Sequence, residues 1–175
     1  LALALRANNG ADRVQVAFAG PEHHCRTAAP VVDQVVPSPW HDWLRTELTR
    51  RSEIAQAAQV TNLYNIAEVP SLVTLIAADD GHRGTAEEEA TMANAVRIGR
   101  SLGVHVILVS PETSIWSRLS AAATGNLSFH VALTNDSGRR VATADTFNTG
   151  HFAFSPAQLG GGELAEWITT VRQAP

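Results

Sequence analysis

The sequence is short of cysteine, of charged residues and of long apolar runs. It has 175 residues and one cysteine, Cys25, which excludes an internal disulfide framework and is consistent with a reducing compartment. No apolar run approaches the roughly 18 residues that a membrane-spanning helix needs. Charged residues make up 17% of the chain and the net charge is −4, so nothing supports broad electrostatic binding to nucleic acid or to an acidic membrane. What remains is a globular protein long enough to bury a core.

Strand-like and helix-like patterns alternate along the chain. Apolar or alternating runs predict strands at residues 14–19, 31–36, 72–78, 104–109, 127–133 and 151–154. Helical spacing predicts helices at residues 1–7, 40–59, 85–102, 114–123 and 163–173. Strands that are apolar along their whole length and alternate with helices indicate a parallel sheet with helices on both faces. We therefore predict one α/β domain. Because the chain opens in mid-helix, we expect it to be a fragment of a longer protein.

Four residues mark the ends of the two long helices. Ser38 is a predicted N-cap, with Pro39 at the first helical position. Thr85 is the predicted N-cap of the next helix, whose first turn carries three glutamates that the helix dipole favours. Gly103 is the predicted C-cap of that second helix.

Several segments resemble one family of motor proteins. Residues 97–108 read Arg-Ile-Gly-Arg-Ser-Leu-Gly-Val-His-Val-Ile-Leu, which is similar to the helix-to-strand junction of the FtsK/SpoIIIE ATPases. The run looks most like the ATPase modules of EccC, the type VII secretion ATPase of actinobacteria. Residues 125–133 and 150–154 resemble two later strands of that family. The resemblance covers about residues 1–155, and the run at 97–108 is its most specific part.

The resemblance implies a fold, a location and partners. The expected fold is a RecA-like P-loop NTPase core, with residues 1–175 forming a single FtsK/SpoIIIE-like domain that starts after the family's phosphate loop. The expected location is the cytoplasmic face of the cell membrane, within a complex that other parts of the chain anchor. The expected partners are neighbouring ATPase modules or subunits, with a secreted substrate's helical signal as a further candidate. Nucleic acid is not expected as a partner.

The motifs that carry hydrolysis in this family are altered. The chain contains no G-x-x-x-x-G-K-[S/T] loop, which in the family would lie just before Leu1. The acidic pair that ends the family's central strand aligns with Ala77 and Ala78, and the Thr-Gln sensor pair with Ser110 and Pro111. Phosphoryl transfer depends on placed charge, and removing one such group typically costs ~10²–10³ in rate. We expect ATP to remain a possible cofactor, Mg²⁺ not to be one, and the ATPase activity to be lost in this module.

A few residues remain candidates for a nucleotide site. Asp79 and Asp80 follow the central strand two positions late, about 7 Å further along, and are either substitute catalytic acids or exposed loop residues. The resemblance adds four weak nucleotide-binding candidates: Ser110, Trp116, Gly150 and Phe152. Trp116 and Phe152 would stack on adenine; otherwise the four tryptophans of the chain are core or subunit contacts.

Four arginines are candidates for a role in trans. In the family, arginines at subunit edges act on a neighbour's nucleotide. The matching candidates here are Arg50, Arg51, Arg97 and Arg100. The alternative is a solvated helix face, with Glu47 and Glu53 close to the first two.

The adjacent residues His23, His24 and Cys25 suggest a metal or nucleophile site only weakly. Neighbouring side chains rarely converge on one ion, and no C-x-x-C or H-x₃-H partner exists in the chain. We predict no metal site, and the family places a surface loop here.

Three functions follow from these observations. The preferred one is a degenerate module of an EccC-like secretion motor, regulatory or substrate-docking, with weak or no ATP hydrolysis. The first alternative is an active DNA-translocating ATPase of the FtsK type, which would need an upstream phosphate loop and a basic surface. The second alternative is a structural module that binds no nucleotide.

Overall fold

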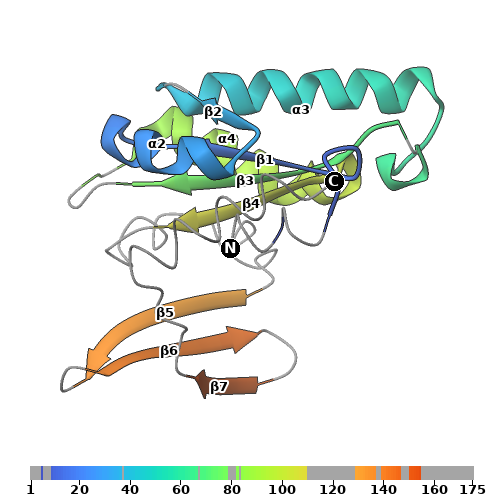
Figure 1. Cartoon of the computed structure of the whole chain (residues 1–175). Helices are drawn as coiled ribbons and strands as arrows, with labels where there is room; N and C mark the ends of the chain where they lie inside the picture. Colours follow the sequence, from blue (N-terminus) through green and yellow to red (C-terminus); the bar gives the residue numbers. More distant parts are fainter. Residues whose placement is uncertain are drawn as a thin grey trace.

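Four parallel strands form the sheet that organises the first two thirds of the chain (Figure 1). The computed structural model describes residues 5, 9–36, 38–66, 68–78, 82, 84–109, 129–136, 139–146 and 150–154. The strands of the parallel sheet are β1 (Val14–Ala19), β2 (Gln34–Val36), β3 (Ser71–Ala77) and β4 (Val104–Val109), in the order β2-β1-β3-β4. The chain therefore leaves β1 toward one edge of the sheet and leaves β3 toward the other.

Helices cover the parallel sheet from opposite sides. They are α2 (Glu22–Ala28), α3 (Trp40–Ala57) and α4 (Ala86–Ile98), with short 3₁₀ helices η1 (Ala29–Val31), η2 (Leu63–Asn65) and η3 (Gly99–Leu102). Crossovers between parallel strands are right-handed, so α2, on the way to β2, lies on the face opposite to α4, on the way to β4. Figure 1 shows α2 in front of the sheet and α4 behind it. The prediction of an α/β fold with a parallel sheet between helices is confirmed. Among the described helices, none is long and apolar enough to cross a membrane.

β3 is buried on both faces, which explains its unbroken apolar sequence. Every residue from Leu72 to Ala77 is buried. Side chains alternate between faces, so Leu72 and Ile76 contact the core that α3 and α4 cover. The neighbouring strand β1 continues this face of the sheet, because Ala19 of β1 pairs with Ile76 of β3. The predicted strand 72–78 thus has the interior position that its composition indicates.

The start of α4 agrees with the sequence, whereas the end of α4 and the start of α3 differ from it. Thr85 caps α4 in a capping box: its Oγ1 accepts from the Glu88 amide at 3.2 Å, and Glu88 Oε2 accepts from the Thr85 amide at 2.7 Å. For α3, Pro39 itself is the N-cap, no side chain caps the helix, and Ser38 precedes it through a cis peptide bond. Gly103 has φ +65°, as expected of a C-cap glycine, but it ends η3 because α4 stops at Ile98.

Two parts of the chain differ from the sequence predictions. Residues 22–28 form α2 where the resemblance placed a surface loop. β5 (Phe129–Asp136), β6 (Arg139–Thr146) and β7 (Gly150–Phe154) form a separate antiparallel sheet in the order β5-β6-β7. β6 was not predicted, because its sequence Arg-Arg-Val-Ala-Thr-Ala-Asp-Thr mixes charged, small and β-branched residues without a clear apolar face.

Candidate functional site

A cavity of about 500 Å³ lies at the carboxyl ends of β1 and β3. Gly20 and Pro21 border it directly after β1, and Ala77 and Ala78 border it at the end of β3. The chain diverges from these two neighbouring strands toward opposite edges of the sheet. In open α/β sheets, this divergence at the carboxyl edge is where ligands bind.

Gly20 allows the two strand ends to approach each other closely. Its φ is +155°, and a Cβ added there would lie 2.9 Å from the Ala77 carbonyl oxygen. On the other side of β3, the Ala78 amide donates to the Val109 carbonyl oxygen at 2.9 Å, which extends the pairing with β4 beyond the end of β3. The border of the cavity is therefore held by backbone contacts among three strands.

Apolar side chains make up much of the cavity wall. Trp40 comes from the start of α3 and Met92 from the middle of α4, while Ile76 and Leu108 come from β3 and β4. Met92 and Ile76 are 3% and 4% exposed and belong to the hydrophobic core. The wall is thus continuous with the core, and its shape is fixed by packing between α3, α4 and the sheet.

The polar side chains of the described lining are three glutamates, Ser38 and His82. Glu22, Glu88 and Glu89 border the cavity, and no lysine or arginine does so among the described residues; Arg83 lies outside them. Glu22 pairs with Arg26 at 2.5 Å, and Glu88 Oε2 accepts from the Thr85 amide and contacts His82 Nε2 at 3.0 Å. Glu89 has no ion-pair or hydrogen-bond partner for its carboxylate in the described part of the chain.

The end of β3 offers no ligand for a metal ion. Ala77 is the last residue of the strand and Ala78 follows it, so the two positions that the sequence resemblance aligned with an acidic pair carry methyl groups. Asp79 and Asp80, the proposed substitutes, lie outside the described residues. Within the described ranges, no group of three or more His, Cys, Asp or Glu side chains is arranged to hold a metal. The described lining therefore does not fit Mg²⁺.

Cys25 borders this cavity, whose described lining also includes acids, apolar groups and His82. Its Sγ lies 3.3 Å from the Gly20 carbonyl oxygen, and the side chain is partly buried. His23 and His24 contact each other, with ring centroids 4.0 Å apart. The sequence did not assign Cys25, Trp40 or Glu89 to a cavity. The one sequence signal that could have helped to locate the cavity was the Thr85 cap, because it marks the start of α4 at the carboxyl edge of the sheet.

Arg51, one of the four candidate arginines, is buried. Its side chain is 1% exposed, because the guanidinium lies between α3 and the loops that lead into β3 and β4. Nε donates to Glu47 Oε1 at 2.7 Å, Nη1 to the Leu102 carbonyl at 3.1 Å and Nη2 to the Pro70 carbonyl at 2.9 Å. The printed contacts of Arg51 all lie within its own chain, and its burial differs from the alternative of a solvated helix face. A role in trans for Arg51 stays a prediction.

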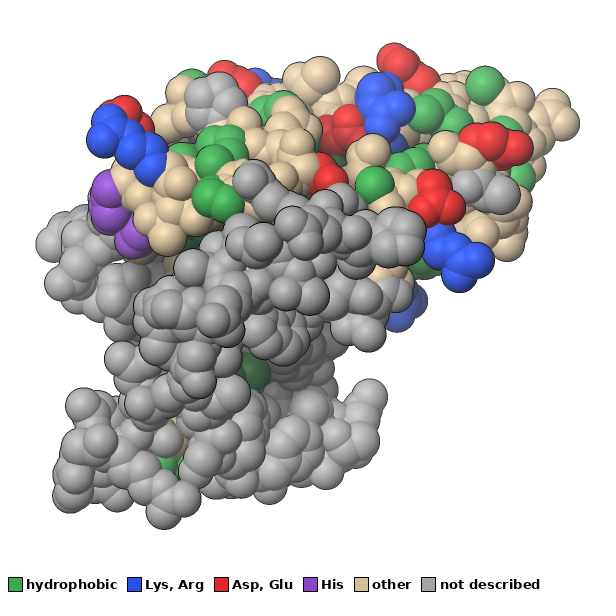
Figure 2. Space-filling view, viewed as in Figure 1, with side chains coloured by type: hydrophobic (Ala, Val, Ile, Leu, Met, Phe, Trp, Pro, Cys, Tyr) green, Lys and Arg blue, Asp and Glu red, His purple; other side chains and the backbone are tan. Residues whose placement is uncertain are grey.

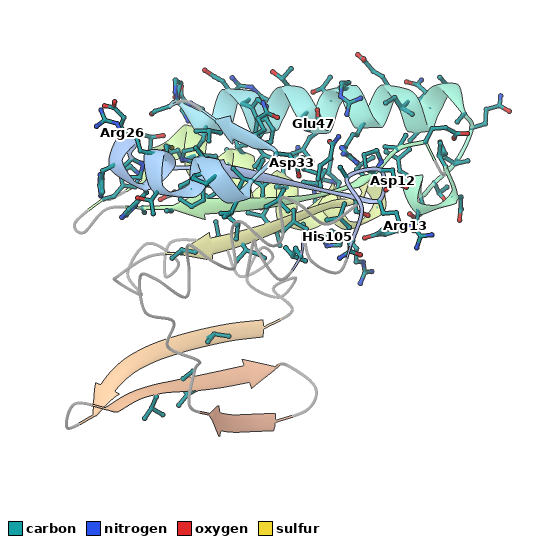
Figure 3. The ribbon with its side chains drawn as sticks, in the orientation of Figure 1. Asp12, Arg13, Arg26, Asp33, Glu47 and His105 are labelled. Carbon is teal, nitrogen blue, oxygen red and sulfur yellow. The ribbon has the colours of Figure 1, made fainter. Side chains whose placement is uncertain are left out.

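The three other candidate arginines are exposed. Arg50 donates two hydrogen bonds to Glu47, of 2.8 and 2.7 Å, which raise the pKa of its guanidinium (Figure 3 labels Glu47 on α3). Burial alone would raise the pKa of Glu47, but the hydrogen bonds and charges of Arg50 and Arg51 outweigh it and lower that pKa. Arg97 donates to Asn94 at 2.9 Å, and Arg100 is exposed on η3. A role in trans for these three stays a prediction.

The predicted nucleotide contacts lie elsewhere or outside the described residues. Ser110 and Trp116 are not among the described residues. Gly150 and Phe152 lie on β7 of the antiparallel sheet. The cavity is therefore built from residues that the sequence did not single out for binding.

Comparison with known proteins gives no match to a protein-family model and none to a curated protein. Solved structures do match. The cytoplasmic domain of the type VII secretion ATPase EccC from Thermomonospora curvata aligns over 98% of this chain and 25% of its own length, with a TM-score of 0.76 and 16% identity. EssC (ATPases 2 and 3) from Geobacillus thermodenitrificans aligns over 98% of this chain and 40% of its own, with a TM-score of 0.70 and 12% identity.

The chain has the fold of these secretion ATPase domains. A further structure, the cytoplasmic domain of EssC, aligns over 98% of this chain at a TM-score of 0.55 and 11% identity. The resemblance that the sequence suggested is thus confirmed at the level of the fold. The chain spans only 25–40% of the length of the three matched structures.

Proposed function

We propose that this chain is a degenerate ATPase module of an EccC-like type VII secretion motor, with weak or no nucleotide binding and no efficient hydrolysis. The observation that carries the proposal is the end of β3, where Ala77 and Ala78 border the cavity with methyl groups. Hydrolysis of ATP needs an acid on Mg²⁺ and a group that orients the attacking water, and an alanine supplies neither.

The electrostatics of the cavity support weak nucleotide binding. A triphosphate is normally held by lysine or arginine and by free amides at a helix N-terminus. Here the described lining carries three glutamates and no such cation. The N-terminus of α4 is already capped by Thr85 and carries Glu87, Glu88 and Glu89 in its first turn. A phosphate at this position would meet like charge.

The proposed role is to regulate a catalytic module or to dock a secreted substrate. One of the similar structures contains ATPases 2 and 3 in one chain, and this chain matches 40% of it. That proportion supports a place beside another ATPase module, with neighbouring modules as partners and a helical signal as a second candidate. In this proposal the membrane is reached through other parts of the assembly.

The surface charge favours this role over DNA translocation. Figure 2 shows acidic and basic side chains interspersed over the face that carries α3, with no basic patch among the residues described there. The net charge of the chain is −4. A DNA-translocating ATPase needs a concentrated basic surface to neutralise phosphates.

ATP turnover by the intact protein, with and without an Asp79→Ala change, tests the proposal. We expect the same rate for both proteins, because an acid placed two residues late does not serve the site. Glu53→Ala, an exposed change on α3, is the matched control. A rate that collapses only in the Asp79 variant would show that this module hydrolyses ATP, and the degenerate assignment would be abandoned.

A further inference from the structure

We infer that the cavity at the carboxyl edge binds an apolar group that carries one positive charge, with Glu89 as its counter-ion. The inference rests on the proposed loss of nucleotide binding and names what the same site accepts instead. The ligand class is that of an alkyl or aryl ammonium ion, the chemistry that a lysine side chain presents on an apolar segment.

The apolar wall supplies the first half of the recognition. A volume of about 500 Å³ falls within the range of ligand pockets, about 300–1,000 Å³. The apolar wall is continuous with the core and offers water few hydrogen-bond partners. It is formed by Trp40, Met92, Ile76 and Leu108. An apolar group that enters this space replaces poorly held water with van der Waals contacts.

Glu89 supplies the second half. Glu22 and Glu88 also border the cavity, but their carboxylates are already engaged with Arg26 and with Thr85 and His82. Glu89 is only partly exposed and has no partner of its own in the described part of the chain. A carboxylate beside apolar surface is incompletely solvated, so it gains from a cation more than a fully exposed one does.

The same lining selects against anions. An anionic ligand of equal size would meet the glutamates without a described cation to offset them. It would also compete with Glu88 for the capped N-terminus of α4. Charge therefore decides which ligands of a given shape enter the cavity.

Cys25 provides a direct readout of occupancy. It is the single cysteine of the chain, and it borders the cavity. The rate at which methyl methanethiosulfonate, a thiol-specific reagent, modifies Cys25 can be followed by mass spectrometry. A ligand in the cavity slows this reaction, and the concentration that halves the rate reports its affinity.

Four probes separate shape from charge. They are 4-phenylbutylamine, 4-phenylbutanol, 4-phenylbutyrate and ATP with Mg²⁺, each added to the purified chain near pH 7.5. The first three share one apolar body and differ in charge. We expect the amine to protect Cys25 at about tenfold lower concentration than the alcohol, as one charge-assisted contact provides, and we expect the carboxylate not to protect.

Two variants of Glu89 complete the test. In Glu89→Gln, the amine should protect Cys25 at the same concentration as the alcohol. In Glu89→Lys, the carboxylate should protect at the lowest concentration of the three. Glu53→Gln, on an exposed part of α3, should change nothing. Equal protection by amine and alcohol in the wild-type chain, or an unchanged preference in both Glu89 variants, would overturn the inference.

The ATP arm separates this inference from the proposed function. Protection of Cys25 by ATP with Mg²⁺, at concentrations where the amine is without effect, would refute both. Failure of the amine and of ATP together would refute the cation site alone and leave the degenerate assignment standing. Thermal unfolding of each variant establishes that its fold is intact before the rates are compared.

Discussion

Arg51, which is buried, forms an ion pair on α3 with the partly buried Glu47, with Nε of the arginine 2.7 Å from Oε1 of the glutamate. The guanidinium also reaches the carbonyl oxygens of Pro70 and Leu102, just before β3 and β4. One side chain therefore fixes the starts of both strands to the helix that crosses them. This link holds the amino edge of the sheet, at the opposite end from the cavity.

Replacing Arg51 should be costly. Arg51→Met should lower the free energy of unfolding by about 2–4 kcal/mol, because it leaves two carbonyls and part of a buried carboxylate without their donors. Arg50→Met should lower it by less than about 1 kcal/mol, since Arg50 is exposed and pairs with the same glutamate in water. Urea denaturation of both variants gives the comparison, and equal effects would contradict the role assigned to Arg51.

Protonation of His105 should destabilise the fold below neutral pH. Burial and the nearby charge of Arg51 lower the pKa of this imidazole from its ordinary value of 6.5 (Figure 3 labels His105 on β4). The unfolded chain therefore binds the proton first, so stability is complete above pH 6.5 and declines as the pH falls below that value. His105→Gln should flatten the decline between pH 6.5 and the lower folded-state pKa, as urea denaturation across that range would show.

Tyr64 offers a control for the His105 prediction. Its hydroxyl is hydrogen-bonded to His105 Nε2, and the ring is half exposed. Tyr64→Phe removes that bond but keeps the burial of the imidazole and the charge of Arg51. The decline in stability should therefore persist in this variant; its disappearance would show that Tyr64 sets the titration.

Gly99 should resist replacement even though alanine is the better helix former. It has helical dihedral angles at the junction of α4 and η3, yet an added Cβ would lie 2.7 Å from the Val104 carbonyl oxygen. Gly99→Ala should destabilise the protein by about 1–3 kcal/mol through this clash with β4. Ala90→Gly, at an exposed site on α4, tests helix propensity alone and should lower the free energy of unfolding by about 1 kcal/mol. A gain in melting temperature for Gly99→Ala would disprove the close approach.

The Thr85 cap should contribute measurably to α4. Thr85→Ala removes the acceptor for the Glu88 amide and should cost about 0.5–2 kcal/mol in thermal or urea unfolding. Thr49→Ala is the matched change within α3, where the hydroxyl bonds back to the Arg45 carbonyl. That variant should be nearly neutral, because the hydroxyl only duplicates a bond that the helix already makes.

The regular elements were predictable wherever a local signal decided them. β3 and β4 were predicted from their unbroken apolar runs, and β3 is buried on both faces as such a run indicates. α4 was predicted because Thr85 and Glu88 satisfy each other at its start. α2 was missed because its seven residues carry no capping side chain and no apolar stripe. Its helical form depends on its position between β1 and β2.

The cavity was not predictable, because it depends on long-range contacts. Trp40, Glu89 and Cys25 lie on three different helices, and only the strand order brings them to one edge of the sheet. Long-range contacts also explain why the burial of Arg51 was not predicted. A helix that carries Glu47 and Glu53 near Arg51 suggests an exposed arginine. The carbonyls that bury Arg51 belong to Pro70 and Leu102, which no local pattern connects to it.

Ala77, which ends β3, and Ala78, which follows it, have a consequence for timing. In a motor whose central strand ends in acids, the arrival and departure of a metal-bound nucleotide set when the subunit moves. Methyl groups at Ala77 and Ala78 respond to neither event, and backbone pairing between Ala78 and Val109 holds them in place. Under the proposed function, this module would not time its own movements, and a neighbouring module would have to set when its contacts change.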